Sequence, residues 1–152
     1  MLKPYDPTEP DRVRANTAPE LNRRIDDRIE ENVRYYAGQP RERIAERIQE
    51  LDNEWDIERF LEAMASSLSL TGVVLALTGD RRWLLLPTFV LSFLLLHAVQ
   101  GWCPPVPVLR RLGVRTREEI ARERYALKAL AGDFEGVASE AGRIERTLTA
   151  VK

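Results

Sequence analysis

The sequence is nearly devoid of the two side chains that most often build reactive or metal-binding sites. Its 152 residues include one cysteine, Cys103, and one histidine, His97. A single cysteine excludes a disulfide within the chain, and no zinc-binding spacing of cysteine and histidine is possible. We therefore expect no metal site, no cofactor and no enzymatic activity.

A positively charged surface is also missing. The chain carries 23 basic and 24 acidic residues, for a net charge of −1, and the two signs are interleaved along the sequence. Nucleic-acid binding needs a basic face, so this composition argues against it. The first 16 residues contain no apolar run of the kind that a cleavable signal peptide has. Insertion into a membrane would therefore depend on internal segments.

Charge is almost absent from the middle of the chain, where formal charges between positions 63 and 109 are confined to the linker Gly79–Arg82. The linker separates two apolar segments, Phe60–Thr78 and Trp83–Trp102, each about as long as the 20 residues that cross a hydrocarbon core. A soluble bundle would have to cover both segments on all sides, and the narrow apolar stripes of the flanking segments are too few for that. We predict an all-α fold built on a two-span transmembrane helical hairpin.

Small side chains line one face of the first span. Ala65, Ser69, Gly72 and Ala76 recur at steps of four, three and four residues. Small residues let two helices approach closely in lipid. We expect this helix-packing face to receive the second span or another copy of the chain.

Amphipathic helices are predicted on both sides of the hairpin domain, which we place at residues 60–116. In the preceding segment, 17–59, Thr17, Pro19 and Glu20 form the pattern of a helix start with a capping box. The segment has two apolar stripes, at Leu21, Ile25, Ile29 and Val33 and at Ile44, Ile48, Leu51 and Trp55. These stripes would pack against each other or a partner helix, or lie on a lipid surface. The pattern leaves open whether the helix breaks at Asp56.

The chain ends are predicted to be less regular. Residues 1–16, with prolines at positions 4, 7 and 10, should be extended or disordered. Prolines 104, 105 and 107 cannot continue the second span, so residues 108–113 should form a short turn at the membrane interface. Thr116 and Glu119 form a capping box, which predicts a helix at the start of the segment 117–152. Gly132 is the predicted C-cap of this helix, and the tail after it is predicted to be weakly helical.

Arginines near the membrane ends predict the orientation of the hairpin. The outer flanks carry seven of them, at positions 47, 59, 110, 111, 115, 117 and 122, whereas the linker has only Arg81 and Arg82. Because positive charge is retained on the cytoplasmic side, both termini are predicted to be cytoplasmic.

The hairpin region resembles a known family of bacterial membrane domains. Its matching elements are the small-residue span with its turn at 72–79, the motif Gly101-Trp102-Cys103-Pro104, and Leu112-Gly113-Val114. Together they resemble the YgaP-like transmembrane domain family, whose function is unknown, over residues 65–116. The resemblance implies a bacterial inner-membrane protein and a larger stand-alone member of that family. Some members are fused to rhodanese domains that handle sulfane sulfur, but this sequence has no such domain.

Cys103 follows the second span and has three possible roles. It is a small side chain suited to a packed helix exit, a reactive thiol that carries sulfur or forms an inter-chain disulfide, or a metal or haem ligand with His97. The structural role is preferred, because only Arg110 and Arg111 are near enough in sequence to lower the pKa of the thiol. A histidine at membrane depth is itself a functional candidate.

The sequence as a whole predicts a non-enzymatic accessory or scaffold protein of the bacterial inner membrane. It would contact lipid and associate with itself or with a larger membrane complex. One alternative is a thiol-dependent component that acts through Cys103. A second is a module that binds anionic lipid headgroups through four arginines near the membrane, Arg110, Arg111, Arg115 and Arg117.

Overall fold

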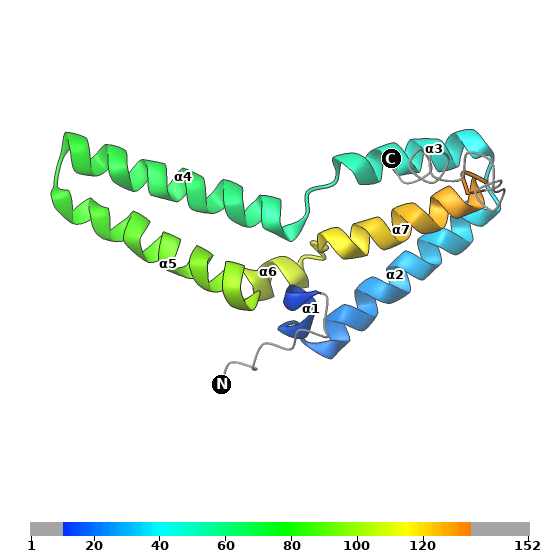
Figure 1. Ribbon diagram of the computed structural model, residues 1–152, viewed down its shortest axis with the longest axis horizontal. Helices are drawn as coiled ribbons and strands as arrows, with labels where there is room; N and C mark the ends of the chain where they lie inside the picture. Colours follow the sequence, from blue (N-terminus) through cyan, green and yellow to red (C-terminus); the bar gives the residue numbers. More distant parts are fainter. Residues whose placement is uncertain (1–10, 135–152) are drawn as a thin grey trace, which may run out of the picture. The chain divides into compact units, whose positions relative to one another are not determined.

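The computed structural model describes residues 11–134, which contain helices and no strand (Figure 1). The elements are α1 (Arg12–Ala15), α2 (Pro19–Ala37), α3 (Arg41–Asn53), α4 (Ile57–Thr78), the 3₁₀ helix η1 (Arg81–Leu84), α5 (Leu85–Gln100), α6 (Val106–Arg111) and α7 (Arg117–Leu130). The predicted all-α class is confirmed. The chain divides into two compact units, which we describe in turn.

The first unit, residues 1–23 and 55–117, contains the apolar hairpin. The helix does break before it, because α3 ends at Asn53 and the side chain of Asp56 accepts a hydrogen bond from the backbone N–H of Arg59 (2.8 Å) at the start of α4. At the tip, Gly79 ends α4, and the Asp80 side chain accepts from the N–H of Arg82 (2.8 Å). Both acidic side chains therefore satisfy amides that a helix start leaves without partners.

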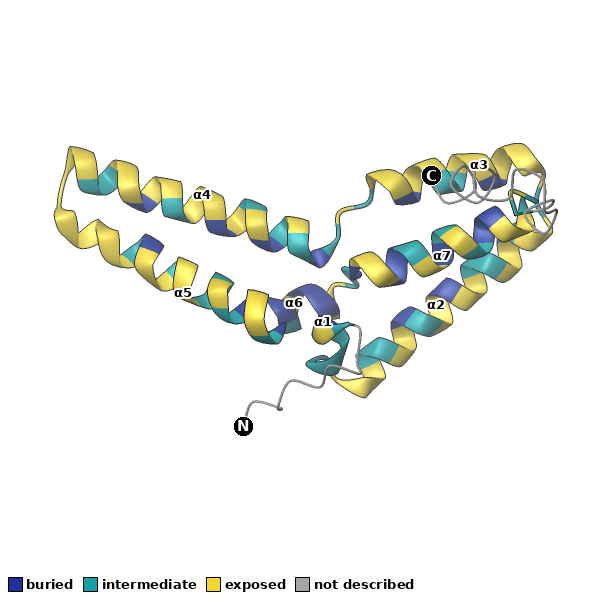
Figure 2. Cartoon of the chain, viewed as in Figure 1, coloured by how far each residue is buried: buried dark blue, intermediate teal, exposed yellow. Residues whose placement is uncertain are grey.

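The two long helices of the hairpin expose most of their apolar side chains (Figure 2). Only 17% of the most apolar 18-residue stretch in the first helix is buried, and 6% of that in the second. Both are long and apolar enough to cross a membrane. In water this surface would be unfavourable by about 25 cal/mol for each Å² that it leaves exposed.

The core of the first unit lies where the base of the hairpin meets α1 and α6. Its buried side chains are Val13, Ile57, Leu61, Cys103, Val106 and Leu109. The prediction of a disordered segment 1–16 is therefore wrong for its last residues, which form α1. The Asp11 side chain accepts from the N–H of Arg14 (2.9 Å), and Val13 is 2% exposed. Residues 1–10 lie outside the described residues.

Two other local predictions need correction. The turn expected at residues 108–113 is wrong for its first four residues, which belong to the helix α6 (Val106–Arg111). Pro105 and Pro107 stand at the start of this helix, where a missing N–H costs nothing. Trp55 does not extend the stripe of α3, because it follows the end of that helix. Its ring contacts Phe60 at 5.2 Å and the guanidinium of Arg59 at 4.4 Å.

The second unit, residues 24–54 and 118–152, packs α3 against α7 and the larger part of α2. Ile44, Leu51, Ile120 and Leu127 form its core, with Tyr36, Ile48 and Ala131 at the edges. Ile25 and Ile29 of the α2 stripe are also buried. The apolar stripes thus pack against helices of the same unit.

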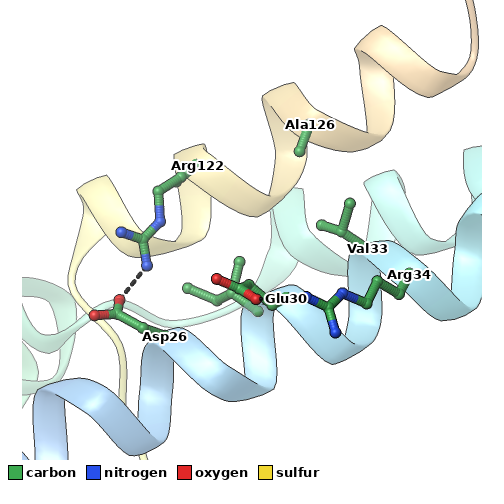
Figure 3. Close-up of a pocket in the computed structure, with 7 residues that line it drawn as sticks. Asp26, Glu30, Val33, Arg34, Arg122 and Ala126 are labelled. Atoms are coloured by element: carbon green, nitrogen blue, oxygen red, sulfur yellow. Dashed lines mark hydrogen bonds and ion pairs between the residues drawn. The ribbon is translucent and has the colours of Figure 1, made fainter.

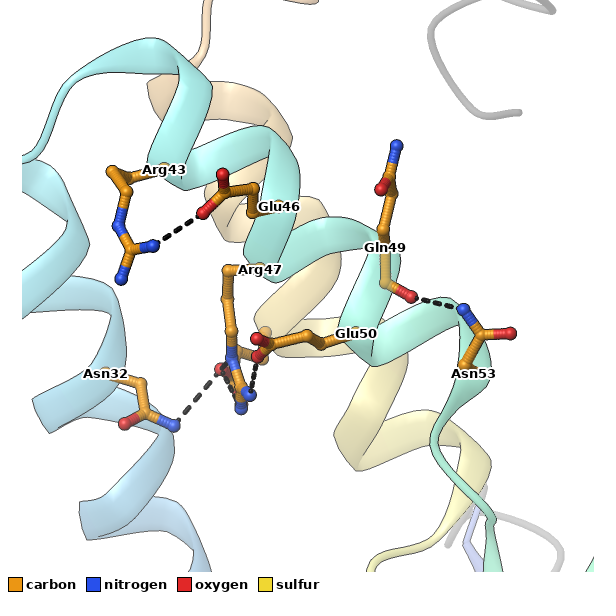
Figure 4. A network of polar contacts seen from close by, with 8 residues as sticks. Asn32, Arg43, Glu46, Arg47, Gln49, Glu50 and Asn53 are labelled. Atoms are coloured by element: carbon orange, nitrogen blue, oxygen red, sulfur yellow. Dashed lines mark hydrogen bonds and ion pairs between the residues drawn. The ribbon is translucent and has the colours of Figure 1, made fainter.

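Polar side chains link the three helices of this unit, and Figure 4 shows Asn32 of α2 and Arg47 and Glu50 of α3 among them. Glu123 of α7 is fully buried, and its Oε1 accepts from Asn32 Nδ2 of α2 (3.1 Å) and from Nε and Nη2 of Arg47 in α3 (3.1 and 3.0 Å). Arg47 also pairs with the exposed Glu50 (2.8 Å). A buried charge is stable only when it is paired in this way.

α7 ends at the predicted C-cap. Gly132 has a φ of 82° and donates to the carbonyl of Ala129 (3.1 Å), while Asp133 donates to that of Lys128 (3.1 Å). This pair of bonds is a Schellman motif, which needs a residue in the left-handed region. The tail predicted after it lies outside the described residues from position 135 onward.

The two carboxylates that contact Arg47 are expected to differ in their contribution to stability. Glu123→Ala leaves Arg47 and Asn32 without their shared acceptor, so it should lower the free energy of unfolding by about 3–5 kcal/mol. Glu50→Ala removes an exposed partner of the same arginine and should cost less than about 1 kcal/mol. Denaturant unfolding in detergent, followed by circular dichroism, compares them, and equal losses would contradict a central role of Glu123.

Candidate functional site at the base of the apolar hairpin

Close packing holds the hairpin together at Gly72. A Cβ at this position would lie 2.5 Å from Cδ of Pro87, 3.1 Å from the carbonyl of Trp83 and 3.2 Å from Cβ of Leu86. Ala65 and Gly72 are buried, and Ser69 and Ala76 are half-buried. At Gly72, the helix-packing face of α4 therefore contacts the second helix of the same chain, and the absence of a side chain there permits the contact.

At the other end of the hairpin, α1 supplies donors to the last turn of α5. Arg12 Nη1 donates to the carbonyl of Ala98, and Asn16 Nδ2 donates to that of Gln100 (2.8 Å). The N–H of Gly101 donates to the carbonyl of His97 (2.7 Å). Carbonyls at a helix C-terminus have no partner within the helix, so these three bonds satisfy groups that would otherwise need water.

Gly101 allows α1 to lie against the C-terminal end of α5. Its φ is 74°, and a Cβ would lie 2.6–2.7 Å from the Cβ and the backbone of Arg12. Two constraints, the left-handed backbone and the contact with α1, thus require glycine here. The first residue of the Gly101-Trp102-Cys103-Pro104 motif has a definite structural role.

Cys103 is part of the core of the first unit. Its side chain is 6% exposed, and its carbonyl accepts from the N–H of Val106 (2.9 Å) at the start of α6. Burial raises the pKa of the Cys103 thiol, which disfavours the reactive thiolate. The geometry is that of a small side chain filling a helix junction.

His97, in the last turn of α5, is also buried, at 9% exposure. Its Nδ1 has no hydrogen-bond partner among the residues that the structure describes. Within the same residues, 11–134, no group of three or more His, Cys, Asp or Glu side chains is placed to hold a metal ion.

The four arginines expected to contact lipid headgroups divide into two pairs. Arg111 and Arg117 are exposed, and Arg117 forms an ion pair with Asp56 (3.1 Å). Arg110 and Arg115, at 1% and 5% exposure, are buried, so the prediction is wrong for these two.

Arg110 is buried because it joins α6 to α2. Its Nη2 donates to Asn22 Oδ1 (2.8 Å), and its Nη1 donates to the carbonyl of Val114 (3.2 Å). Asn22 Nδ2 in turn donates to the carbonyl of Arg14 (3.0 Å), which extends the network to α1. Thr116 Oγ1 donates to Asp11 Oδ2 and links the start of α7 to the same segment.

Sequence reasoning missed the residues of α1 and its neighbours, Arg12, Asn16 and Asn22. The only local signal was Asp11, an N-cap residue placed before a short run that contains one apolar side chain, Val13. Three prolines just upstream obscured it.

Comparisons with known proteins add no relative. No family model matches the chain, and neither a curated protein nor a solved structure does.

Gly101→Ala is expected to destabilise the base of the hairpin. Left-handed backbone alone costs a residue with a side chain about 1–2 kcal/mol, and the contact with Arg12 adds to that loss. We expect a lower melting temperature in detergent and faster trypsin cleavage at Arg12 and Arg14. Gly38→Ala is the control, because its nearest neighbour is the carbonyl of Tyr35 at 4.0 Å. Similar effects of the two changes would disprove the role assigned to Gly101.

Proposed function

We propose that the chain is a non-enzymatic accessory or scaffold protein of the bacterial inner membrane. The observation that supports this most is the exposed apolar surface of α4 and α5, of which only 17% and 6% of the most apolar stretches are buried. The 22 residues of α4, and the 20 residues of η1 and α5 together, are long enough to cross a lipid core about 30 Å thick. The hairpin would then anchor the chain in the membrane.

Both termini are proposed to lie in the cytoplasm. Arg81 and Arg82 at the hairpin tip are outnumbered by the arginines of the outer flanks, and cationic residues near membrane ends are retained on the cytoplasmic side. The second unit would therefore lie on the cytoplasmic side.

Membership of the YgaP-like transmembrane domain family is part of the same proposal. It rests on the motifs quoted above, and the geometry adds a physical reason for two of their residues. Gly72 permits close helix contact, and Gly101 permits the approach of α1.

A thiol-dependent function is less well supported. The raised pKa and the burial of Cys103 support a structural role for this side chain. A headgroup-binding module is also less well supported, because Arg110 and Arg115 are engaged inside the first unit.

Site-directed labelling tests insertion and orientation together. Reporter cysteines replace Asp6, Asp80 or Ala150, one at a time, in a Cys103→Ser background. In intact cells a membrane-impermeant maleimide should label position 80 and leave positions 6 and 150 unlabelled until the cells are permeabilised. Shielding of all three would mean that the chain does not cross the membrane, and labelling of positions 6 and 150 alone would reverse the orientation.

Association should survive extraction in a mild detergent. The light-scattering mass of the purified protein, corrected for detergent, is expected to exceed that of one 152-residue chain, since a scaffold works through stable contacts. The same sample in dodecyl sulfate gives the mass of the single chain and is the control. A single-chain mass in the mild detergent, with no other protein present, would contradict the scaffold role.

A further inference from the structure

The groove between α2 and α7 in the second unit is bridged by its own side chains (Figure 3). Ile29, Val33 and Ala126 line it, and Arg122 of α7 pairs with Asp26 of α2. An ion pair between the two helices thus already crosses this apolar surface. The short helix α6 of the first unit is different, because one of its apolar faces is exposed.

α6 has large apolar side chains on two faces. Val106 and Leu109 lie in the core of the first unit, at 1% and 9% exposure. Val108 and Leu112, four residues apart and therefore on one face, are 54% and 75% exposed. Arg111 beside them is exposed as well. An outer face with aliphatic side chains next to an arginine is typical of a helix that lies in a membrane interface.

The packing of α6 fixes its level relative to the hairpin. Val106 and Leu109 share their core cluster with Ile57 and Leu61, which belong to the first two turns of α4. The 22 residues of α4 give it a length of about 33 Å, slightly more than a hydrocarbon core of about 30 Å. When the rest of α4 crosses this core, its first turns and α6 lie at the boundary between acyl chains and headgroups.

Trp55 and Arg59 mark the same end of the hairpin. Trp55 is 41% exposed, and the guanidinium of Arg59 lies 4.4 Å from the centre of its ring. Tryptophan concentrates at membrane–water interfaces, and an arginine near a helix end can place its charged group among the headgroups. Both side chains therefore favour the headgroup layer at the level where α6 lies.

We propose that α6 lies in the headgroup layer of the bilayer, with Val108 and Leu112 inserted among the upper acyl chains and Arg111 beside the lipid phosphates. This inference rests on the proposed membrane anchor, because the hairpin brings α6 to the bilayer surface. A free helix of six residues would bind lipid weakly. Held at the surface by the hairpin, α6 needs only the burial of its exposed aliphatic side chains to stay there.

Depth-dependent fluorescence quenching tests this placement in the full-length protein. Leu112→Cys is made in a Cys103→Ser background and labelled with the dye NBD. The control within the span is Leu91→Cys, because Leu91 is 51% exposed and lies near the middle of α5. Both proteins are reconstituted into bilayers of phosphatidylcholine and phosphatidylglycerol that contain lipids with a nitroxide either close to the headgroup or deep in the acyl chain.

The shallow nitroxide should quench the label at position 112 roughly twofold more than the deep one, because an interfacial helix buries its apolar face about 5–10 Å into the headgroup and acyl boundary. The label at position 91 should show the reverse order. Aqueous iodide should quench the label at position 112 severalfold less than the free cysteine adduct of the dye.

A polar substitution on the same face gives a second measurement. Val108→Glu in the labelled Leu112→Cys protein should raise quenching by iodide severalfold, because a charged side chain resists insertion among acyl chains. Val108→Leu keeps the face apolar and is the matched control. Equal iodide quenching in the two variants would overturn the proposal.

The quenching pattern separates this inference from the proposed function. If iodide quenches position 112 as fully as the free adduct while position 91 behaves as expected, the placement of α6 is overturned and the membrane anchor stands. Protection from iodide without quenching by either nitroxide would also overturn it, because a protein surface, such as a second copy, would then cover α6. If neither nitroxide quenches position 91, the chain does not lie in the bilayer, and the proposed function fails together with this inference.

Discussion

The structure of the first unit depends on the hydrogen-bonding needs of the last turn of α5. α5 is an apolar helix followed by prolines, so its last carbonyls have no hydrogen-bond partner within the helix. A carbonyl without a hydrogen bond is costly wherever water is scarce. Arg12 and Asn16 supply side-chain donors, and Gly101 supplies its backbone N–H. The bonds from Arg12 and Asn16 hold the short helix α1 against α5, and Val13 is part of the core.

Further contacts of the unit follow from this arrangement. Once α1 lies against α5, Asp11 is within reach of Thr116, and Asn22 can bridge the backbone of α1 and the guanidinium of Arg110. An arginine that would otherwise be a surface charge thereby becomes a buried structural residue. Cys103 is enclosed by the same elements, which explains why the one thiol of the chain is a packing residue with a disfavoured thiolate.

Both units are built from helices, but different contacts hold the helices of each unit together. In the hairpin, the two helices approach closely at Gly72, where the absence of a side chain permits contact with Pro87 and Leu86. In the second unit, narrow apolar stripes meet in the ordinary way, and a buried carboxylate, Glu123, accepts from both neighbouring helices. That carboxylate selects one arrangement of α2, α3 and α7, since few others would satisfy it.

The local features of this protein could be predicted from its sequence. Helical class, the two apolar segments, the stripes of α2 and α3 and the glycine C-cap of α7 follow from periodicity and from the conformational freedom of glycine, which act within a few residues. The partners of Arg12, Asn16 and Arg110 could not, because they lie 84–88 residues away along the chain. The sequence around an arginine does not show whether its guanidinium faces solvent or a buried hydrogen-bond acceptor. Only the tertiary structure decided that Arg110 and Arg115 are internal and Arg111 and Arg117 external, because burial depends on which distant backbone and side-chain groups the fold brings within hydrogen-bond distance.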